Sequence, residues 1–371
     1  MQKNPLKFFP LLVSKRLKIF LTVIQDGYDP QSVPSAFSVI PRRENEVFVF
    51  RDTWYPEKVR EYVESFKKID TSNLIFLSNT EEIHEERKKH GMVSHFINID
   101  CFLDSEVFNI MPGAAGRKKY DAVYNARFFV YAGKEIKRHF LTEGITNLAL
   151  IDSYYNSWPT DYELRLRDKY IKRPNVAYYN KRVLPATAVA DVLNQSRVGL
   201  ILSELEGACK ASGEYLLCGL PVVSTPSVGG RDIWYDNYNS IICNPTKEAV
   251  NNAVGHFLKN MPDPHKIRKR YLELAEKHEM RFINDVIGRL FEKYGIRSDP
   301  KEFFERNKNG IIKAWLCLYR DYLTIDQLNA RGIKRDLVVW IAGRSRPKRW
   351  WIWGYFLHRL KMALLRAVSG H

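Results

Sequence analysis

The middle of the chain alternates short apolar runs with helical patterns, and this alternation constrains the fold more than any other feature. Helical spacing of apolar residues occurs over 134–141, 160–170 and 186–195. Runs of strand length occur at 122–124, 147–151, 176–179, 198–202, 221–224 and 240–243. This order predicts a doubly wound, mainly parallel sheet, because each crossover helix returns the chain to the same end of the sheet.

The first third of the chain repeats the pattern and predicts a second α/β unit. The expected elements are strands at 18–24, 46–50, 73–77 and 95–99, and helices at 55–69 and 79–90. A Gly-rich break at 112–117 (PGAAGR) separates the two units. Because 371 residues exceed the usual size of a single core, we expect two domains, 1–115 and 116–280.

The composition excludes two classes of protein. Apolar residues make up 45% of the chain, too many for a disordered protein, and charged residues make up 27%, too many for an integral membrane bundle. No apolar run approaches the roughly 18 residues of a membrane-spanning helix, and the run 8–13 is too short for a secretory signal. The five cysteines are odd in number and lack CxxC spacing, so we expect a reducing compartment and no structural zinc site.

Two glutamates mark the part of the sequence that is most informative about chemistry. Glu206 lies in the loop after the strand-like run 198–202, and Glu214 lies in a predicted helix over 211–218. Gly207 frees the intervening backbone, so the N–H groups at the start of this helix can bind a phosphate. A carboxylate beside them can accept two hydrogen bonds from a ribose. A nucleotide diphosphate is the ligand that needs both features together.

The residues after Glu214 continue with CGLPVV over 218–223 and with the pair Gly229-Gly230. Together with the two glutamates, they resemble the donor-binding signature of the retaining GT-B glycosyltransferases of family 4, the group 1 glycosyl transferases. An earlier strand ending in Ala-Arg, 120–127 (YDAVYNAR), also fits the family, as does a lysine soon after it. The resemblance covers about 118–248.

The resemblance implies a role for each matching residue. Glu214 would bind the ribose hydroxyls of the nucleotide, and Glu206 would contact hydroxyls of the donor sugar. Arg127 and a lysine, Lys137 or Lys134, would bind the diphosphate and stabilise the charge on the leaving nucleotide. The expected catalytic residues are Glu206, Arg127 and Lys137. The expected donor-binding residues are Glu214, Gly207, Lys210, Lys134, Gly229, Gly230 and Gly27.

The resemblance also implies an architecture and a reaction type. The expected fold class is α/β, a GT-B arrangement of two Rossmann-like domains that face a crevice, with the acceptor on the first domain and the donor on the second. A crossover helix over 281–298 and a C-terminal helical extension over 299–371 would follow. The sequence has no Asp-x-Asp motif, so we expect a metal-independent hexosyltransferase with no cofactor besides its nucleotide-sugar substrate.

Other positions depart from the family pattern. Ala208, Cys209 and Lys210 stand where the family commonly has Phe-Gly and an aliphatic residue, and Lys210 is a candidate phosphate contact. The histidines His84, His90 and His95 come late in the first domain, and none of them is assigned to the active-site histidine of the family; His95 fits a strand histidine better than a catalytic group. The segment 100–108 (DCFLDSEVF) resembles the family's Asn-Gly-x-Asp turn with the Asn-Gly lost.

The C-terminal segment 331–371 differs chemically from the rest of the chain. It has ten Lys/Arg and one acidic residue, more than half of the net charge of +16, and four of the eight tryptophans. Over 348–368 its apolar residues recur at helical steps, beginning with Trp350 and Trp353. A basic helix with tryptophans on its apolar face is typical of an anionic membrane surface. The alternative is a helix that packs on the protein's own body.

We therefore expect a cytoplasmic enzyme, peripheral on the inner face of the plasma (inner) membrane. It would move a sugar from a nucleotide sugar to a lipid-linked glycan or lipid acceptor, in the synthesis of O antigen, capsule or lipopolysaccharide. Two alternatives are a non-catalytic GT-B-like partner subunit and a basic nucleic-acid-binding protein. No helix-turn-helix, RRM or zinc pattern supports the latter, so we expect no nucleic-acid partner.

Overall fold

The computed structural model describes residues 6–24, 33–38, 40, 43–51, 59–131, 133–152 and 160–315. They belong to the first of the two compact units into which the chain divides, Met1–Arg331. The second unit, Gly332–His371, lies outside the described residues, and so do Gly27 and the predicted membrane helix over 348–368. None of the described helices is long and apolar enough to cross a membrane.

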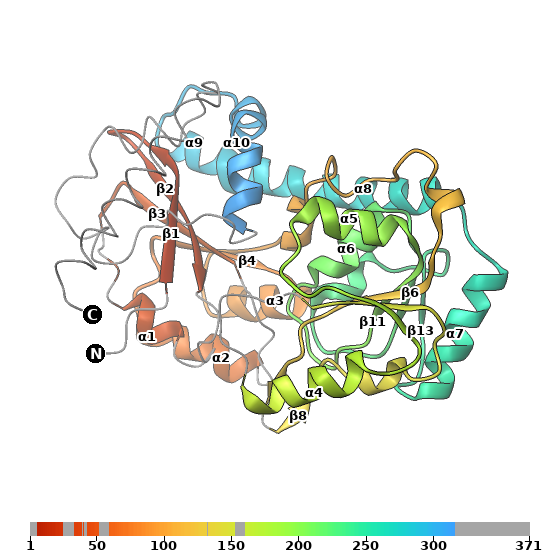
Figure 1. Ribbon diagram of the computed structural model, residues 1–371. Helices are drawn as coiled ribbons and strands as arrows, with labels where there is room; N and C mark the ends of the chain where they lie inside the picture. Colours follow the sequence, from red (N-terminus) through yellow and green to blue (C-terminus); the bar gives the residue numbers. More distant parts are fainter. Residues whose placement is uncertain are drawn as a thin grey trace, which may run out of the picture. The chain divides into compact units, whose positions relative to one another are not determined.

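The first sheet has five strands in the order β1-β2-β3-β4-β5 (Figure 1). The strands are β1 (Leu6–Val13), β2 (Lys18–Ile24), β3 (Glu46–Arg51), β4 (Leu74–Ser78) and β5 (Ser94–Phe96). The helices of this part are α1 (Val33–Phe37), α2 (Val59–Ser65), which continues as a 3-10 turn, and α3 (Glu81–Lys89). Strands β2 to β5 pair in parallel, as the sequence predicts. These hydrophobic strands are almost wholly buried, as is usual for a parallel sheet.

Strand β1 was not predicted from the sequence. It pairs antiparallel with β2 at the edge of the sheet, and its register shifts between Pro10 and Leu12. Proline lacks a backbone N–H, so within a sheet it is tolerated only in an edge strand or at a bulge. Pro10 meets both conditions, because it lies in the edge strand β1 and beside the register shift. Helix α10 (Pro300–Trp315) packs against both β1 and β2.

The second sheet has six parallel strands in the order β10-β9-β6-β11-β12-β13. The strands are β6 (Tyr120–Asn125), β9 (Leu148–Ile151), β10 (Val176–Tyr179), β11 (Ser196–Ile201), β12 (Val222–Ser224) and β13 (Ser240–Ile242). The helices are α4 (Asp161–Ile171), α5 (Ala186–Asn194), α6 (Lys210–Leu217) and α7 (Lys247–Lys259). The strand order reverses between β6 and β11, and open parallel sheets bind ligands at such a point.

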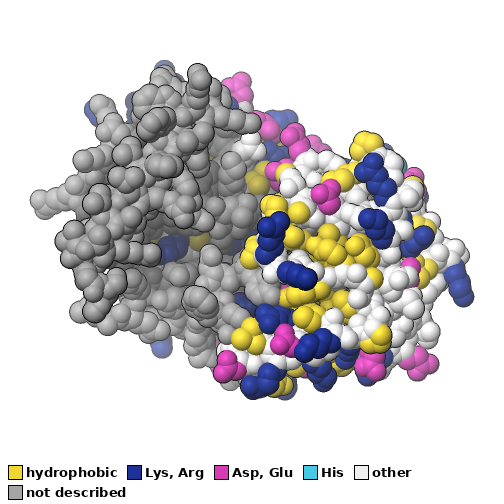
Figure 2. Space-filling view, in the orientation of Figure 1, with side chains coloured by type: hydrophobic (Ala, Val, Ile, Leu, Met, Phe, Trp, Pro, Cys, Tyr) yellow, Lys and Arg dark blue, Asp and Glu magenta, His cyan; other side chains and the backbone are white. Residues whose placement is uncertain are grey.

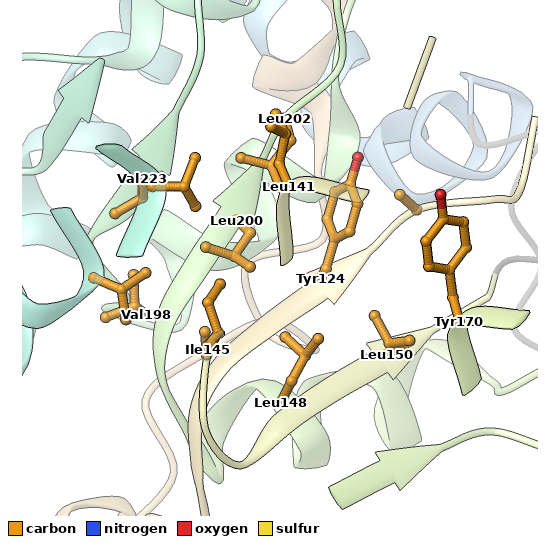
Figure 3. Close-up of a cluster of buried hydrophobic side chains, with 14 of the residues drawn as sticks. Tyr124, Leu141, Ile145, Leu148, Leu150, Tyr170, Val198, Leu200, Leu202 and Val223 are labelled. Atoms are coloured by element: carbon orange, nitrogen blue, oxygen red, sulfur yellow. The ribbon is translucent and has the colours of Figure 1, made fainter. Parts of the chain in front are cut away.

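A cluster of buried apolar side chains packs on one face of the second sheet. Leu148 and Leu150 come from β9, Val198 and Leu200 from β11, and Tyr170 from α4. Figure 3 shows these side chains gathered together with others from the loops between the strands. The carboxyl ends of β6 and β11 are thus fixed by a packed core just below them.

One predicted helix, over 134–141, is wrong. The segment begins as a small antiparallel pair, β7 (Val130–Tyr131) with β8 (Lys134–Glu135), and ends as a 3-10 helix, His139–Thr142. Gly133 has φ 77° in the turn, and Arg138 has φ 51°. Two left-handed residues so close together interrupt an α-helix, although the apolar spacing alone suits one.

The helices after β13 lead back to the first sheet. Helix α8 (Pro264–Arg281) runs without a break through a π-helical stretch, Phe282–Gly288, into α9 (Arg289–Lys293). Helix α10 follows and buries apolar residues such as Ile311. Its first turns pack Phe304 against Phe102 and Phe282.

Candidate functional site

The candidate site lies at the point where the strand order of the second sheet reverses. Strand β6 ends at Asn125, and the loop after β11 carries Ser203, Glu206 and Gly207 to the same edge. Helix α6 begins directly after this loop, at Lys210. The site is therefore assembled from the carboxyl ends of two neighbouring parallel strands and one helix N-terminus.

Glu206 and Lys137 form an ion pair at this edge. The ammonium group of Lys137 donates to Glu206 Oε1, and Ser203 Oγ donates to the same oxygen at 2.5 Å. The two charged side chains are 12% and 17% exposed, so the pair is partly open to solvent. The Tyr124 hydroxyl donates to the Lys137 carbonyl and fixes the backbone. Of the two candidate lysines, the fold brings Lys137 to Glu206, whereas Lys134 is exposed on β8.

Glu214 lies about one turn into α6 and faces the end of β6. Its Oε2 accepts a hydrogen bond from the Asn125 side-chain amide at 3.0 Å. The Asn125 backbone N–H in turn donates to the Tyr215 hydroxyl at 2.7 Å, which fixes α6 against the strand. Burial raises the pKa of Glu214 to about 7, and the positive charge of Lys210 opposes this rise. The Glu214 carboxyl group thus accepts a hydrogen bond from Asn125 but is not neutralised by a close ion pair in the described part of the chain.

The loop with Gly229 and Gly230 packs directly on the loop that carries Glu206. Gly229 has φ 128°, and a Cβ atom at this position would lie 1.4 Å from the Glu206 carbonyl oxygen. The Gly230 N–H donates to the Gly207 carbonyl at 3.0 Å. Only glycine fits at Gly229, because both its backbone conformation and the close approach exclude a side chain.

The same loop is joined to the first sheet through two asparagines. The Asn98 side chain donates to the Gly230 carbonyl at 2.9 Å and to the Asn79 carbonyl at 3.3 Å. A Cβ on Gly230 would lie 2.3 Å from that Asn79 carbonyl oxygen. Because Asn79 and Asn98 follow β4 and β5, the ends of the first sheet and the glycine loop of the second meet here.

Arg231 lies buried beside the site and was not among the predicted site residues. Its side chain is fully buried, and its guanidinium donates to the carbonyl groups of Ser203 and Thr225. A third hydrogen bond, 3.1 Å long, joins it to Asp232. The arginine therefore ties the ends of β11 and β12 together next to Glu206. Nothing local in the sequence distinguishes it from a surface arginine after a glycine turn.

One of the predicted catalytic residues lies apart from the Glu206–Lys137 pair. Arg127 stands after β6, but its guanidinium is 4.0 Å from Glu163 at the start of α4 and lies over the Phe129 ring. His95 is in β5, where burial lowers its pKa to about 4 and the nearby Asp285 opposes the shift. Within the part of the chain that the structure describes, no group of three or more His, Cys, Asp or Glu side chains could hold a metal ion.

Comparison with known proteins finds similarity to solved structures only. No protein-family model matches the chain, and no curated protein matches it. Among solved structures, it is similar to HepE from Anabaena in complex with UDP, with 13% identity over 71% of this chain and 76% of that chain and a TM-score of 0.50. A sucrose-phosphate synthase from Thermosynechococcus elongatus has 16% identity over 69% of this chain and 70% of that one, with a TM-score of 0.49.

Identities this low show the fold alone. The α/β fold class with two Rossmann-like sheets, predicted from the sequence as GT-B, is confirmed by the two mainly parallel sheets and by the likeness to HepE.

Proposed function

We propose that the chain is a retaining, metal-independent glycosyltransferase of the family 4 type, with a nucleotide sugar as donor. The observation that carries this proposal is the joint position of Glu206, Lys137 and Glu214 at the reversal point of the second sheet. A cation and a helix N-terminus suit a diphosphate, and a carboxylate with a free lone pair suits a ribose. The fold likeness to HepE, which is described in complex with UDP, agrees with it.

The residues would divide the work of the transfer as follows. Glu214 accepts hydrogen bonds from the ribose, and Glu206 positions the donor sugar. Lys137 turns from Glu206 to the diphosphate and stabilises the charge that grows on the leaving nucleotide. Arg127 joins it only if its side chain leaves Glu163, a partner 4.0 Å away in this structure. The protein thus supplies position and positive charge, and hexosyl transfer needs no protein nucleophile.

The choice between two lysines gives a testable prediction. Lys137→Ala is expected to lower kcat for nucleotide-sugar hydrolysis or transfer by about 100-fold, because a hydrogen-bonded cation at the leaving group is lost. Lys134→Ala, which removes an exposed lysine three positions away, is the matched control and is expected to change kcat less than about threefold. Equal losses in the two variants would show that Lys137 has no special part in the reaction.

We also propose that the acceptor is a lipid-linked saccharide or a lipid of the bacterial envelope, used at the cytoplasmic face of the membrane. The basic, tryptophan-rich segment 331–371 supports this. Additional basic side chains lie on the described surface over α4, where Arg165, Lys169 and Lys172 are exposed (Figure 2). Such charges favour anionic lipid by about 1 kcal/mol each near the surface.

The membrane proposal predicts the effect of removing two tryptophans. Replacing Trp350 and Trp353 by serine in the full chain is expected to reduce binding to vesicles with anionic phospholipid by at least about tenfold, because large aromatic side chains at the interface are lost. Sedimentation with vesicles measures this, and replacing Trp54, near the N-terminal end of the chain, is the control. Undiminished sedimentation of the double variant would contradict the role of 348–368.

A further inference from the structure

Asp100 is a buried acid that links the first half of the chain to the candidate donor site. It lies in a 3-10 helix, Ile99–Phe102, between the two sheets in the chain order, and is 1% exposed. Its backbone is held on both sides: the N–H donates to the Asn98 side chain at 3.1 Å, and the carbonyl accepts from the Tyr271 hydroxyl at 2.6 Å. The position of its carboxyl group is therefore fixed by the fold.

The carboxyl group lies at the N-terminus of α6. Its Oδ2 accepts the backbone N–H of Cys209, the N-cap residue of this helix, at 2.8 Å. Its Oδ1 is buried and has no hydrogen-bond partner among the described residues. The N-terminal end of a helix carries partial positive charge, and a diphosphate would use that same charge. An internal anion thus already occupies part of the electrostatic site that the donor needs.

The charged groups around Asp100 belong to both the site and the first sheet. The cations that act on it are Lys210, the first residue of α6, and Arg51, at the end of β3. The negative charge of Glu206 acts on Asp100, and the negative charge of Asp100 acts on Glu214. The buried Cys101 and Tyr271 also feel its charge. Asp100 and Glu214 therefore both interact with Lys210, whereas Glu206 is paired with Lys137.

We propose that Asp100 is an internal counter-anion of the donor site, and that its negative charge competes with the donor's diphosphate for the N-terminus of α6 and for Lys210. This inference rests on the proposed function, because it assumes that a diphosphate binds there. Asp100 itself stays buried and does not touch the donor. It sets the affinity for the donor through charge alone.

The competition depends on pH in a defined direction. Burial raises the pKa of Asp100 to about 7, against the opposing charge of Lys210. Below pH 7 the group is neutral and does not repel the diphosphate, whereas above pH 7 it is ionised and weakens binding. A neutral replacement of Asp100 should therefore matter at pH 8 and not at pH 6.

The test compares the wild type with Asp100→Asn, whose carbonyl oxygen can still accept the Cys209 N–H. Calorimetric titration with UDP-, GDP-, ADP- and dTDP-sugars at pH 6 and pH 8 gives the affinities, and these diphosphate diesters exchange no proton of their own in this range. At pH 8 the variant is expected to bind the preferred donor about tenfold more tightly than the wild type, and at pH 6 equally tightly. The charge of Asp100 adds to burial in raising the pKa of Glu214, so Asp100→Asn also lowers that pKa. At pH 8 Glu214, whose pKa is about 7 in the wild type, is largely ionised in both proteins, and at pH 6 Asp100 is largely neutral and has little effect on it.

Two further variants complete the experiment. Asp104→Asn, which keeps the cap of a turn at Glu106 and Val107 and changes the net charge equally, is expected to leave affinity unchanged at both pH values. Asp100→Ser removes the charge with a different acceptor group and replaces Asp100→Asn if that variant does not fold. Equal or weaker binding by the neutral variants at pH 8 would overturn the inference and leave the proposed function intact. If no nucleotide sugar binds to the wild type, the proposed function fails and the inference fails with it.

Discussion

At pH 8, where Glu214 with its pKa of about 7 is largely ionised, Glu214→Gln is expected to lower kcat/KM for the nucleotide sugar by about 100-fold or more, because hydrogen bonds from ribose hydroxyls to a charged acceptor are replaced by weaker ones to an amide. The substitution keeps the volume of the side chain, and its amide oxygen can still accept from Asn125, as the carboxylate does at 3.0 Å. Release of nucleoside diphosphate measures the effect. The unfolding temperature shows whether the fold is kept.

A matched control separates the loss of one carboxylate at the site from the loss of any carboxylate. Glu248 lies exposed in the first turn of α7, and Glu248→Gln is expected to leave kcat/KM unchanged. Unaltered turnover by Glu214→Gln, in a protein that hydrolyses or transfers from a nucleotide sugar, would show that the donor binds elsewhere.

Gly229→Ala is expected to have the second large effect. A Cβ at this position would lie 1.4 Å from the Glu206 carbonyl oxygen, and the backbone has φ 128°, where side chains are strained. The loop must therefore move, which separates Glu206 from Lys137 and lowers activity by about 100-fold. We expect the free energy of unfolding to fall by about 3 kcal/mol, as measured by denaturant titration.

Gly255→Ala is the control for this substitution. Gly255 lies in α7, and a Cβ there would meet no atom within 4 Å. Alanine is favoured over glycine in a helix, so this variant should be more stable by about 0.5–1 kcal/mol and fully active. If Gly229→Ala were as active and as stable as the wild type, the close packing of the glycine loop on the Glu206 loop would be contradicted.

The sequence predicted the strands and helices of the second sheet well because their periodicity is local. The run at 176–179 has the observed bounds. The helix over 134–141 was wrong because left-handed residues and a tertiary contact from Tyr124 override apolar spacing. Strand β1 was missed because Pro10 and the lysines around it do not look like a strand without the neighbouring β2.

In the candidate site, too, the residues that local sequence marks were predicted, and those that depend on tertiary contacts were not. Glu206 and Glu214 were found because they share one short stretch with recognisable spacing. Arg231 and Asp100 were not, because their importance lies in contacts with residues that are distant in the chain, such as the 2.8 Å hydrogen bond from Cys209 to Asp100. The sequence could not decide between Lys134 and Lys137, because the turn at Gly133 determines which of them reaches Glu206.

The most direct test of the central claim is a calorimetric and hydrolysis screen of the full chain against a panel of nucleotide sugars, run in parallel on the wild type and on Glu214→Gln. We expect one nucleotide class to bind the wild type and to be hydrolysed slowly to the nucleoside diphosphate, with both signals lost in the variant. If no nucleotide sugar binds, or if the variant binds and turns over as the wild type does, the account of a donor site at the ends of β6 and β11 is wrong.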